Sequence, residues 1–98
     1  MRLDYLEYFE AAARTGSISG AAVQLGRNRS TVSMAIAALE DELGAELFVR
    51  RGNSLTLSPV GEHILDDCAR IIALSNSIIE RCARGEETAG QELRIGRD

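Results

Sequence analysis

Lysine and tryptophan are absent from this sequence, proline occurs once and cysteine twice. Two cysteines, Cys68 and Cys82, are too few for the disulfide framework of a small secreted protein. No apolar run approaches the length of a membrane-spanning helix, and the first residues lack the apolar stretch of a signal peptide. These absences predict a protein of the reducing cytoplasm that has no membrane partner.

The length and bulk composition are those of one globular domain. The chain has 98 residues, of which 45% are hydrophobic and 27% are charged. A chain of this length can bury a modest core without covalent cross-links. This composition excludes an intrinsically disordered or fibrous protein. The sequence also contains no internal repeat and no low-complexity tract.

The net charge of −4 argues against a nucleic-acid partner, but the distribution of charge favours one. Segments 25–39 and 47–61 each hold two arginines and no acid; these arginines are Arg27, Arg29, Arg50 and Arg51. The rest of the chain carries the other seven arginines and all fifteen acids. Two basic segments therefore interrupt an acidic body. Chance clustering in a small chain produces the same pattern, so charge alone does not decide between the two explanations.

Apolar residues recur at helical spacing through the first half of the chain. The sequence predicts a first helix from Leu3 that ends at Gly16, a short second helix over 17–26 and a third over 29–43. The candidate N-cap residues are Ser17 or Ser19 for the second helix and Asn28 or Ser30 for the third. The residues expected to face the core are Leu3, Leu6, Phe9, Ala13, Ala21, Ala22, Leu25, Val32, Ile36, Leu39 and Leu43.

The outer face of the third helix is unusual because it carries small, uncharged side chains. They are Ser30, Ser33, Met34 and Ala37. A solvated helix face usually carries charge. Here the acids Glu40, Asp41 and Glu42 occur only in the last turn, at the unfavourable end of the helix dipole.

A β-hairpin follows, and then a long helix. Strand-like runs at 47–49 and 55–57 flank the segment 50–54, whose Gly and Asn favour a hairpin turn. Ser58 and Pro59 are typical of a helix start. The long helix runs from Pro59 to about Arg84. Its apolar seam comprises Ile64, Leu65, Cys68, Ile71, Ile72, Ser75, Ile78, Ile79 and Cys82.

The seam of the long helix is too extensive for the N-terminal unit to cover, so a partner helix is expected to cover it. If two copies pair antiparallel about Ser75, then Cys68 of one chain faces Cys82 of the other; if the two-fold axis lies nearer Ile71 or Ile72, the two cysteines do not face each other. Residues 85–92 resemble a linker, and residues 93–96 alternate like the opening of a strand. The predicted division is therefore 1–58, a domain of three helices and a hairpin; 59–84, a dimerisation helix; and 85–98, a hinge and the start of a further domain.

Two short helices joined by a glycine turn form a helix-turn-helix, in which the second helix enters the major groove. Ala21 and Ala22 are small enough for the helices to meet closely, and Gly26 permits the turn. The hairpin would be a wing whose arginines reach phosphates or the minor groove. The candidate DNA-binding residues are Arg27, Asn28, Arg29, Ser30, Thr31, Ser33, Met34, Arg50, Arg51 and Asn53.

The sequence resembles the N-terminal region of LysR-type transcriptional regulators, closely over residues 3–62. The resemblance rests on Leu6, Phe9, Gly16-Ser17-Ile18, Ala21-Ala22, Leu25, Thr31-Val32-Ser33, Ile36, Leu39-Glu40, Leu43-Gly44, Leu47-Phe48, Arg50, Leu57 and Gly61. It implies a mostly α-helical winged helix-turn-helix with three helices and a hairpin wing, followed by a long dimerisation helix. It also implies a homodimer on an interrupted palindrome in double-stranded DNA. The full-length protein would form a dimer or a tetramer, and a domain outside this chain would sense a small-molecule effector.

The contact positions depart from the pattern of the family. Members often have Ser-Gln-Pro or Ser-Gln-Ser at 28–30 and arginine at 34, where this chain has Asn28-Arg29-Ser30 and Met34. Arg29 is a candidate bidentate reader of guanine. Met34 cannot hold a phosphate but can pack on a thymine methyl group. Arg27 replaces the usual apolar residue of the turn. The resemblance therefore implies DNA binding without defining the target sequence.

Other functions have weaker support in the sequence. His63 and Asp67 supply two ligands at helical spacing, whereas zinc takes four, so neither a metal nor another cofactor is expected. No glycine elbow or phosphate loop marks a catalytic site, and the chain is not expected to be an enzyme. The remaining alternative is a helical dimerisation and protein-interaction module that does not bind DNA.

Overall fold

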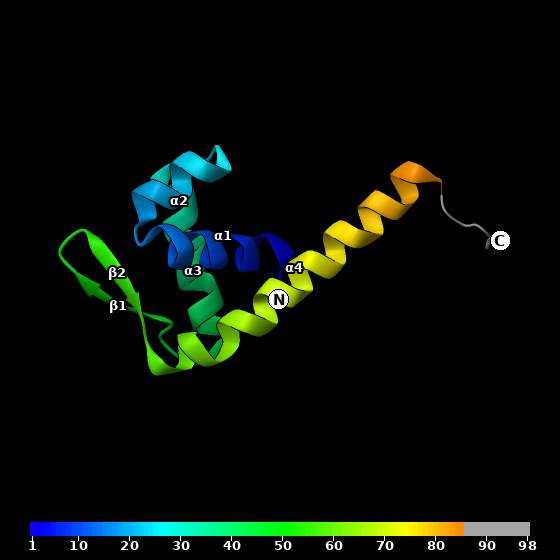
Figure 1. Cartoon of the computed structure of the whole chain (residues 1–98). Helices are drawn as coiled ribbons and strands as arrows, with labels where there is room; N and C mark the ends of the chain where they lie inside the picture. The colour runs from blue at the N-terminus through cyan, green and yellow to red at the C-terminus, as the bar shows by residue number, and fades with distance from the viewer. Residues whose placement is uncertain (86–98) are drawn as a thin grey trace.

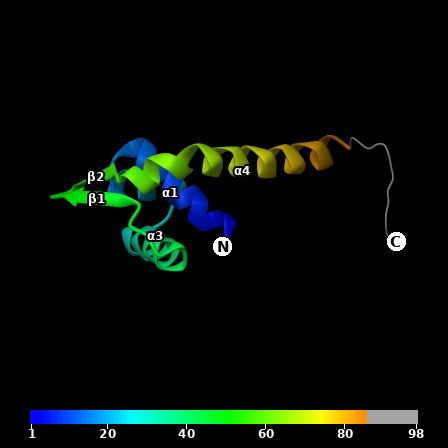
Figure 2. The same cartoon turned by 90° about the horizontal axis from the view of Figure 1, so that it is seen from below.

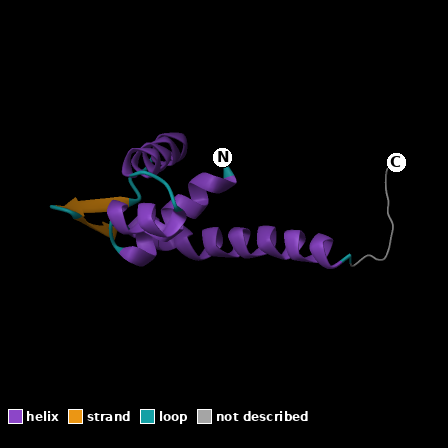
Figure 3. Ribbon diagram, turned by 90° about the horizontal axis from the view of Figure 1, so that it is seen from above, coloured by secondary structure: helices purple, strands orange, loops and turns teal. Residues whose placement is uncertain are grey.

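The computed structural model describes residues 1–85, which form four helices and one hairpin in the order α1–α2–α3–β1–β2–α4. Helices α1 (Leu3–Thr15), α2 (Ile18–Leu25) and α3 (Arg29–Leu43) pack together. Figure 1 shows that α4 (Pro59–Arg84) passes along this bundle and then extends beyond it. The hairpin and the free end of α4 lie at opposite ends of the molecule (Figure 2, Figure 3).

Local sequence signals explain where each helix begins. The side chains of Ser17, Asn28 and Ser58 accept hydrogen bonds from the backbone N–H groups of Gly20, Thr31 and Gly61, at 2.8, 2.8 and 3.0 Å. Each bond satisfies one of the N–H groups that lack an acceptor at a helix start. Of the candidate caps, the chain therefore uses Ser17 and Asn28.

The core lies where α1 and α3 meet the base of the hairpin. Its largest fully buried side chains are Phe9, Val32, Ile36, Leu39 and Leu47. The rings of Phe9 and Phe48 pack with their centroids 5.4 Å apart. The predicted inner stripe of α3 is confirmed up to Leu39 but is wrong for Leu43, which is 42% exposed. Leu43 ends the helix, and the chain turns away at Gly44 in left-handed backbone.

The hairpin pairs β1 (Phe48–Arg51) with β2 (Ser54–Leu57) in antiparallel register, from Phe48 opposite Leu57 to Arg51 opposite Ser54. Both strands extend further toward the tip than the apolar runs predict, because backbone pairing does not depend on apolar side chains. Arg50 and Arg51 are therefore strand residues. Only a two-residue turn remains, and Gly52 takes the positive φ of 59° that such turns require.

The hairpin is attached to the helices at both ends. The N–H of Leu55 donates to the carbonyl of Gly16 at 2.9 Å. At the base, the N–H of Leu47 donates to the carboxylate of Glu40 at 2.8 Å. The Ser58 N–H donates to the carbonyl of Leu47, and the Ser58 hydroxyl donates to that of Glu46. These bonds tie the wing to α1, α3 and α4 and hold it beside α3.

Candidate nucleic-acid interface

After Arg29 at its start, the outward face of α3 is largely exposed and carries no charge until its last turn. Ser30, Met34 and Ala37 are exposed, whereas Ser33 and Thr31 are partly buried. Met34 is 71% exposed although it is a large apolar side chain. Exposure of an apolar side chain to water is unfavourable, and a macromolecular partner that covers the side chain removes this unfavourable free energy. This face is therefore a candidate contact surface, as the sequence predicts.

Four arginines, in the turn before α3, at the start of α3 and in β1, have no ion-pair partner in residues 1–85. They are Arg27, Arg29, Arg50 and Arg51, all exposed. Arg14 pairs with Glu10 at 2.7 Å, Arg84 with Glu80 at 3.8 Å, and Arg70 with both Asp66 and Asp67. Arg2 pairs with Asp4 at 3.0 Å. The predicted basic segments thus present positive charge that the acidic body does not neutralise.

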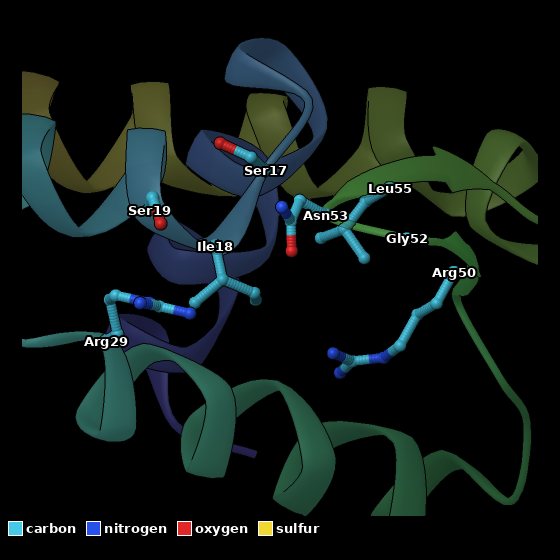
Figure 4. A pocket seen from close by; sticks show the side chains of 8 residues that line it. All are labelled: Ser17, Ile18, Ser19, Arg29, Arg50, Gly52, Asn53 and Leu55. Carbon is cyan, nitrogen blue, oxygen red and sulfur yellow. The ribbon is translucent and has the colours of Figure 1, made fainter.

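Arg29 and Arg50 face one hollow of about 340 Å³ between α2, α3 and the hairpin. Its lining residues are Ser17, Ile18, Ser19, Arg29, Arg50, Gly52, Asn53 and Leu55. Figure 4 shows the two arginines reaching into the space from opposite sides, Arg29 from the start of α3 and Arg50 from β1. The structure therefore brings together residues from both basic segments of the sequence.

The other predicted contact residues lie around this hollow or on α3. Asn28 uses its carbonyl oxygen to cap α3, so only its amide group remains for a partner. Thr31 and Met34 border a shallow depression against Tyr5 and Tyr8 of α1. Asn53 is at the tip of the hairpin.

The apolar surface of α4 divides into a part covered by its own domain and a part left open. Ile64, Leu65 and Ile72 pack partly against the core. Toward the free end, Ile71 is 40% exposed, and Ile78 and Ile79 are each 63% exposed. Ser75 lies among them and is partly buried. The open face also includes Leu74, 65% exposed, which the sequence prediction omitted although it follows Ile71 by three residues.

The structure differs from the sequence prediction at Cys68. Its side chain is 4% exposed and belongs to the core of its own domain, whereas Cys82 is exposed. Burial, with a smaller contribution from Asp67, raises the pKa of the Cys68 thiol. A buried thiol that resists ionisation is a poor partner for a disulfide with another chain. Cys68 therefore belongs to the packing of α4 on its own domain.

Within residues 1–85, no cluster of three or more His, Cys, Asp or Glu side chains could hold a metal ion. His63 is exposed on α4. No helix in the same range is long and apolar enough to cross a membrane.

Comparison of the sequence with known protein families identifies one match. Residues 3–62 match the model of the bacterial regulatory helix-turn-helix proteins of the lysR family. The chain belongs to the LysR family. Among curated LysR relatives, the probable HTH-type transcriptional regulator LrrA of Synechococcus elongatus is 39% identical over 95 residues, which are 97% of this chain and 32% of LrrA. The chain thus spans about a third of the length of that relative.

Solved structures with the same fold include members of the LysR family. A full-length OxyR of Pseudomonas aeruginosa superposes with a TM-score of 0.83 at 30% identity, over 89% of this chain and 30% of that one. The DNA-binding domain of CbnR, solved as a complex with DNA, gives a TM-score of 0.79 at 29% identity, over 87% of this chain and 98% of that one. The predicted fold, a winged helix-turn-helix followed by a long helix, is confirmed. The lysR model describes bacterial regulatory helix-turn-helix proteins, and LrrA is a probable transcriptional regulator.

Proposed function

We propose that this chain is the DNA-binding and dimerisation part of a bacterial transcriptional regulator. Residues 1–58 form the DNA-binding domain and residues 59–84 the dimerisation helix. The sequence assigns residues 85–98 to a hinge and the start of an effector-binding domain, and residues 86–98 lie outside the part of the chain that the structure describes. The length of the LysR relatives supports a further domain, because LrrA extends far beyond the matched region. The regulator acts in the cytoplasm, forms a dimer or tetramer, and senses a small-molecule effector through that further domain.

One observation carries the proposal: in a chain of net charge −4, four exposed arginines near the uncharged face of α3 have no ion-pair partner within residues 1–85. Arginines that only improved solubility would be expected to pair with the abundant acids, as the arginines of α1 and α4 do. Unpaired guanidinium groups are instead suited to the bidentate recognition of phosphate. The known DNA complex of the CbnR domain, which shares this fold, supports the same assignment.

The proposed contacts fall into two classes. Ser30, Ser33 and Met34 face base edges in the major groove, where hydroxyl groups bond to bases and a thioether packs on a thymine methyl group. Residues of the second class contact the DNA backbone or the minor groove and fix the position of the protein along the duplex. They are Arg27, Asn28, Thr31, Arg50, Arg51 and Asn53, while the role of Arg29 is argued separately below.

The open face of α4 is proposed to pair with the same face of a second copy. Ile71, Leu74, Ile78 and Ile79 would become buried, and full burial of one such side chain contributes about 1.5–3 kcal/mol. An antiparallel pair related by a two-fold axis presents two α3 helices to one side of the duplex. Half-sites would then be about one helical turn, or a multiple of it, apart.

Binding to duplex DNA at increasing salt tests the proposal. Genomic fragments captured by the wild-type protein supply the specific duplex, and footprinting on it should show two related half-sites. The logarithm of the binding constant should fall linearly with the logarithm of salt, by about 0.9 for each phosphate contacted. Arg51→Ala should flatten this slope. Arg70→Ala is the matched control, because Arg70 is an exposed arginine already paired with Asp66 and Asp67.

Two results would contradict the proposal. A protein that dimerises but binds no duplex would be the interaction module that the sequence left open. Protection of one unpaired half-site at saturating protein would contradict the dimer.

A further inference from the structure

The hollow between α2, α3 and the hairpin has an electrostatic imbalance that requires an explanation. Arg29 and Arg50 are the only charged residues among its lining residues, and both are cations. Neither forms an ion pair with any residue in the described part of the chain. Two cations that face one concavity repel each other, and an anion placed between them removes this cost.

The remaining wall of the hollow offers hydrogen-bond donors. The Ser19 hydroxyl and the Asn53 amide both lie on it. The Ser17 hydroxyl already accepts from the Gly20 N–H, so it caps α2 and helps to hold this wall in place. The wall is also fixed to the hairpin, because Gly16 accepts a hydrogen bond from Leu55 at 2.9 Å. The two arginines therefore face each other from parts of the fold that are fastened together.

The position of the hollow indicates which anion it holds. If α3 lies in the major groove and the hairpin meets the next groove along the duplex, one DNA strand separates the two grooves. That strand must pass between α3 and the hairpin. Arg29 begins α3 and Arg50 lies in β1, so the strand crosses the hollow that they border. What a strand presents at such a crossing is its phosphodiester backbone.

We infer that the hollow binds a single backbone phosphate, which Arg29 and Arg50 hold from opposite sides. This inference rests on the proposed function and assigns a different role to Arg29 from the one that the sequence predicts. Arg29 then positions the protein on DNA and does not read a guanine. Sequence discrimination falls to the outer face of α3.

Duplexes that carry one neutral methylphosphonate at successive positions test the inference directly. Wild-type protein should lose affinity at each contacted phosphate, and one such position in each half-site is the phosphate in the hollow. The Arg29→Ala and Arg50→Ala variants should each bind the unmodified duplex roughly tenfold more weakly. Neutralising the phosphate at that same position should cost each variant less affinity than it costs wild-type protein, because only one of the two arginines remains to bind it. Arg27→Ala and Arg51→Ala are the controls, since neither arginine lines the hollow and neither has an ion-pair partner in residues 1–85. Both control variants should still lose as much affinity as wild-type protein when that phosphate is neutralised.

A second comparison separates phosphate binding from base reading. Loss of the Arg29 side chain should weaken binding to the captured duplex and to a scrambled duplex by the same factor. A loss confined to the captured duplex would make Arg29 a base reader and overturn the inference. If Arg29→Ala and Arg50→Ala reduced the effect of neutralisation at two different phosphates, the inference would be overturned as well. In both cases wild-type protein still binds DNA, whereas failure of wild-type protein to bind any duplex would overturn the proposed function itself.

Discussion

Gly61 shows how a single missing side chain sets the position of the long helix. A Cβ atom at this residue would collide with the carbonyl oxygen of Leu47 and lie 3.0 Å from Cδ2 of Leu57. The same Leu47 carbonyl accepts the N–H of Ser58, so the backbone there cannot easily move away. Only glycine lets α4 begin this close to the base of the wing.

Replacement of Gly61 by alanine is therefore expected to destabilise the protein. In a solvent-exposed helix the same change stabilises, because glycine is the weaker helix former. Here we expect a loss of about 1–3 kcal/mol in the free energy of unfolding, caused by overpacking against backbone. Urea denaturation of Gly61→Ala, with Val60→Ala at the exposed neighbouring position as control, measures the difference. A more stable Gly61→Ala variant would show that α4 does not approach Leu47 this closely.

At the scale of the elements, a partly buried hydrogen bond joins the last turn of α3 to the start of the wing. Leu47 is fully buried, and its N–H has the Glu40 carboxylate as acceptor. The acids at the end of α3 oppose the helix dipole, but Glu40 offsets this cost by satisfying a backbone donor. Asp41 is its exposed neighbour and makes no such bond to the wing.

Removal of the Glu40 carboxylate should loosen the wing relative to α3. Glu40→Ala leaves the Leu47 N–H without its acceptor, which costs about 1–3 kcal/mol. Glu40→Gln keeps an acceptor oxygen and should lose much less, and Asp41→Ala should lose little. Thermal unfolding of the three variants gives this order. Equal stability of Glu40→Ala and Asp41→Ala would mean that the hydrogen bond contributes nothing to the attachment of the wing.

At the scale of the whole molecule, the apolar face of α4 has one part that packs on its own domain and one part that is exposed. Its first half packs on its own domain through Ile64, Leu65, Cys68 and Ile72. Its second half extends past the domain with apolar side chains exposed (Figure 1). Because the apolar face of α4 continues past the domain on which the helix packs, a second partner is required to cover that part of the face. A second copy of α4 is the cover that we propose.

Charges placed on the open face of α4 should separate the proposed dimer without unfolding the domain. We expect Leu74→Glu combined with Ile78→Glu to yield folded monomers in sedimentation experiments, with weakened binding to a two-half-site duplex. Ala73→Glu combined with Ser77→Glu places the same charge on the opposite, exposed face and should remain dimeric. Survival of the dimer in the first variant would place the interface elsewhere.

The sequence by itself determined the features of the fold that depend on near neighbours in the chain. The Ser58–Pro59 start of α4, the left-handed glycines that end the helices, and the Gly52 turn of the hairpin are local, so short-range steric and hydrogen-bonding rules predict them. The apolar spacing also predicted most of the core and the uncharged face of α3. The candidate interface residues on α3 were proposed for the same reason, since they are the side chains that this spacing leaves outside the core.

Only the tertiary structure decided which distant groups meet. Arg29 and Arg50 are far apart in the sequence and face one hollow because the Leu55–Gly16 hydrogen bond and the Glu40–Leu47 contact hold the wing beside α3. The apolar seam of α4 was one stripe in the sequence, yet the domain covers its first half and not its second. Helical periodicity defines a face but not its neighbour, because burial depends on where the rest of the chain packs.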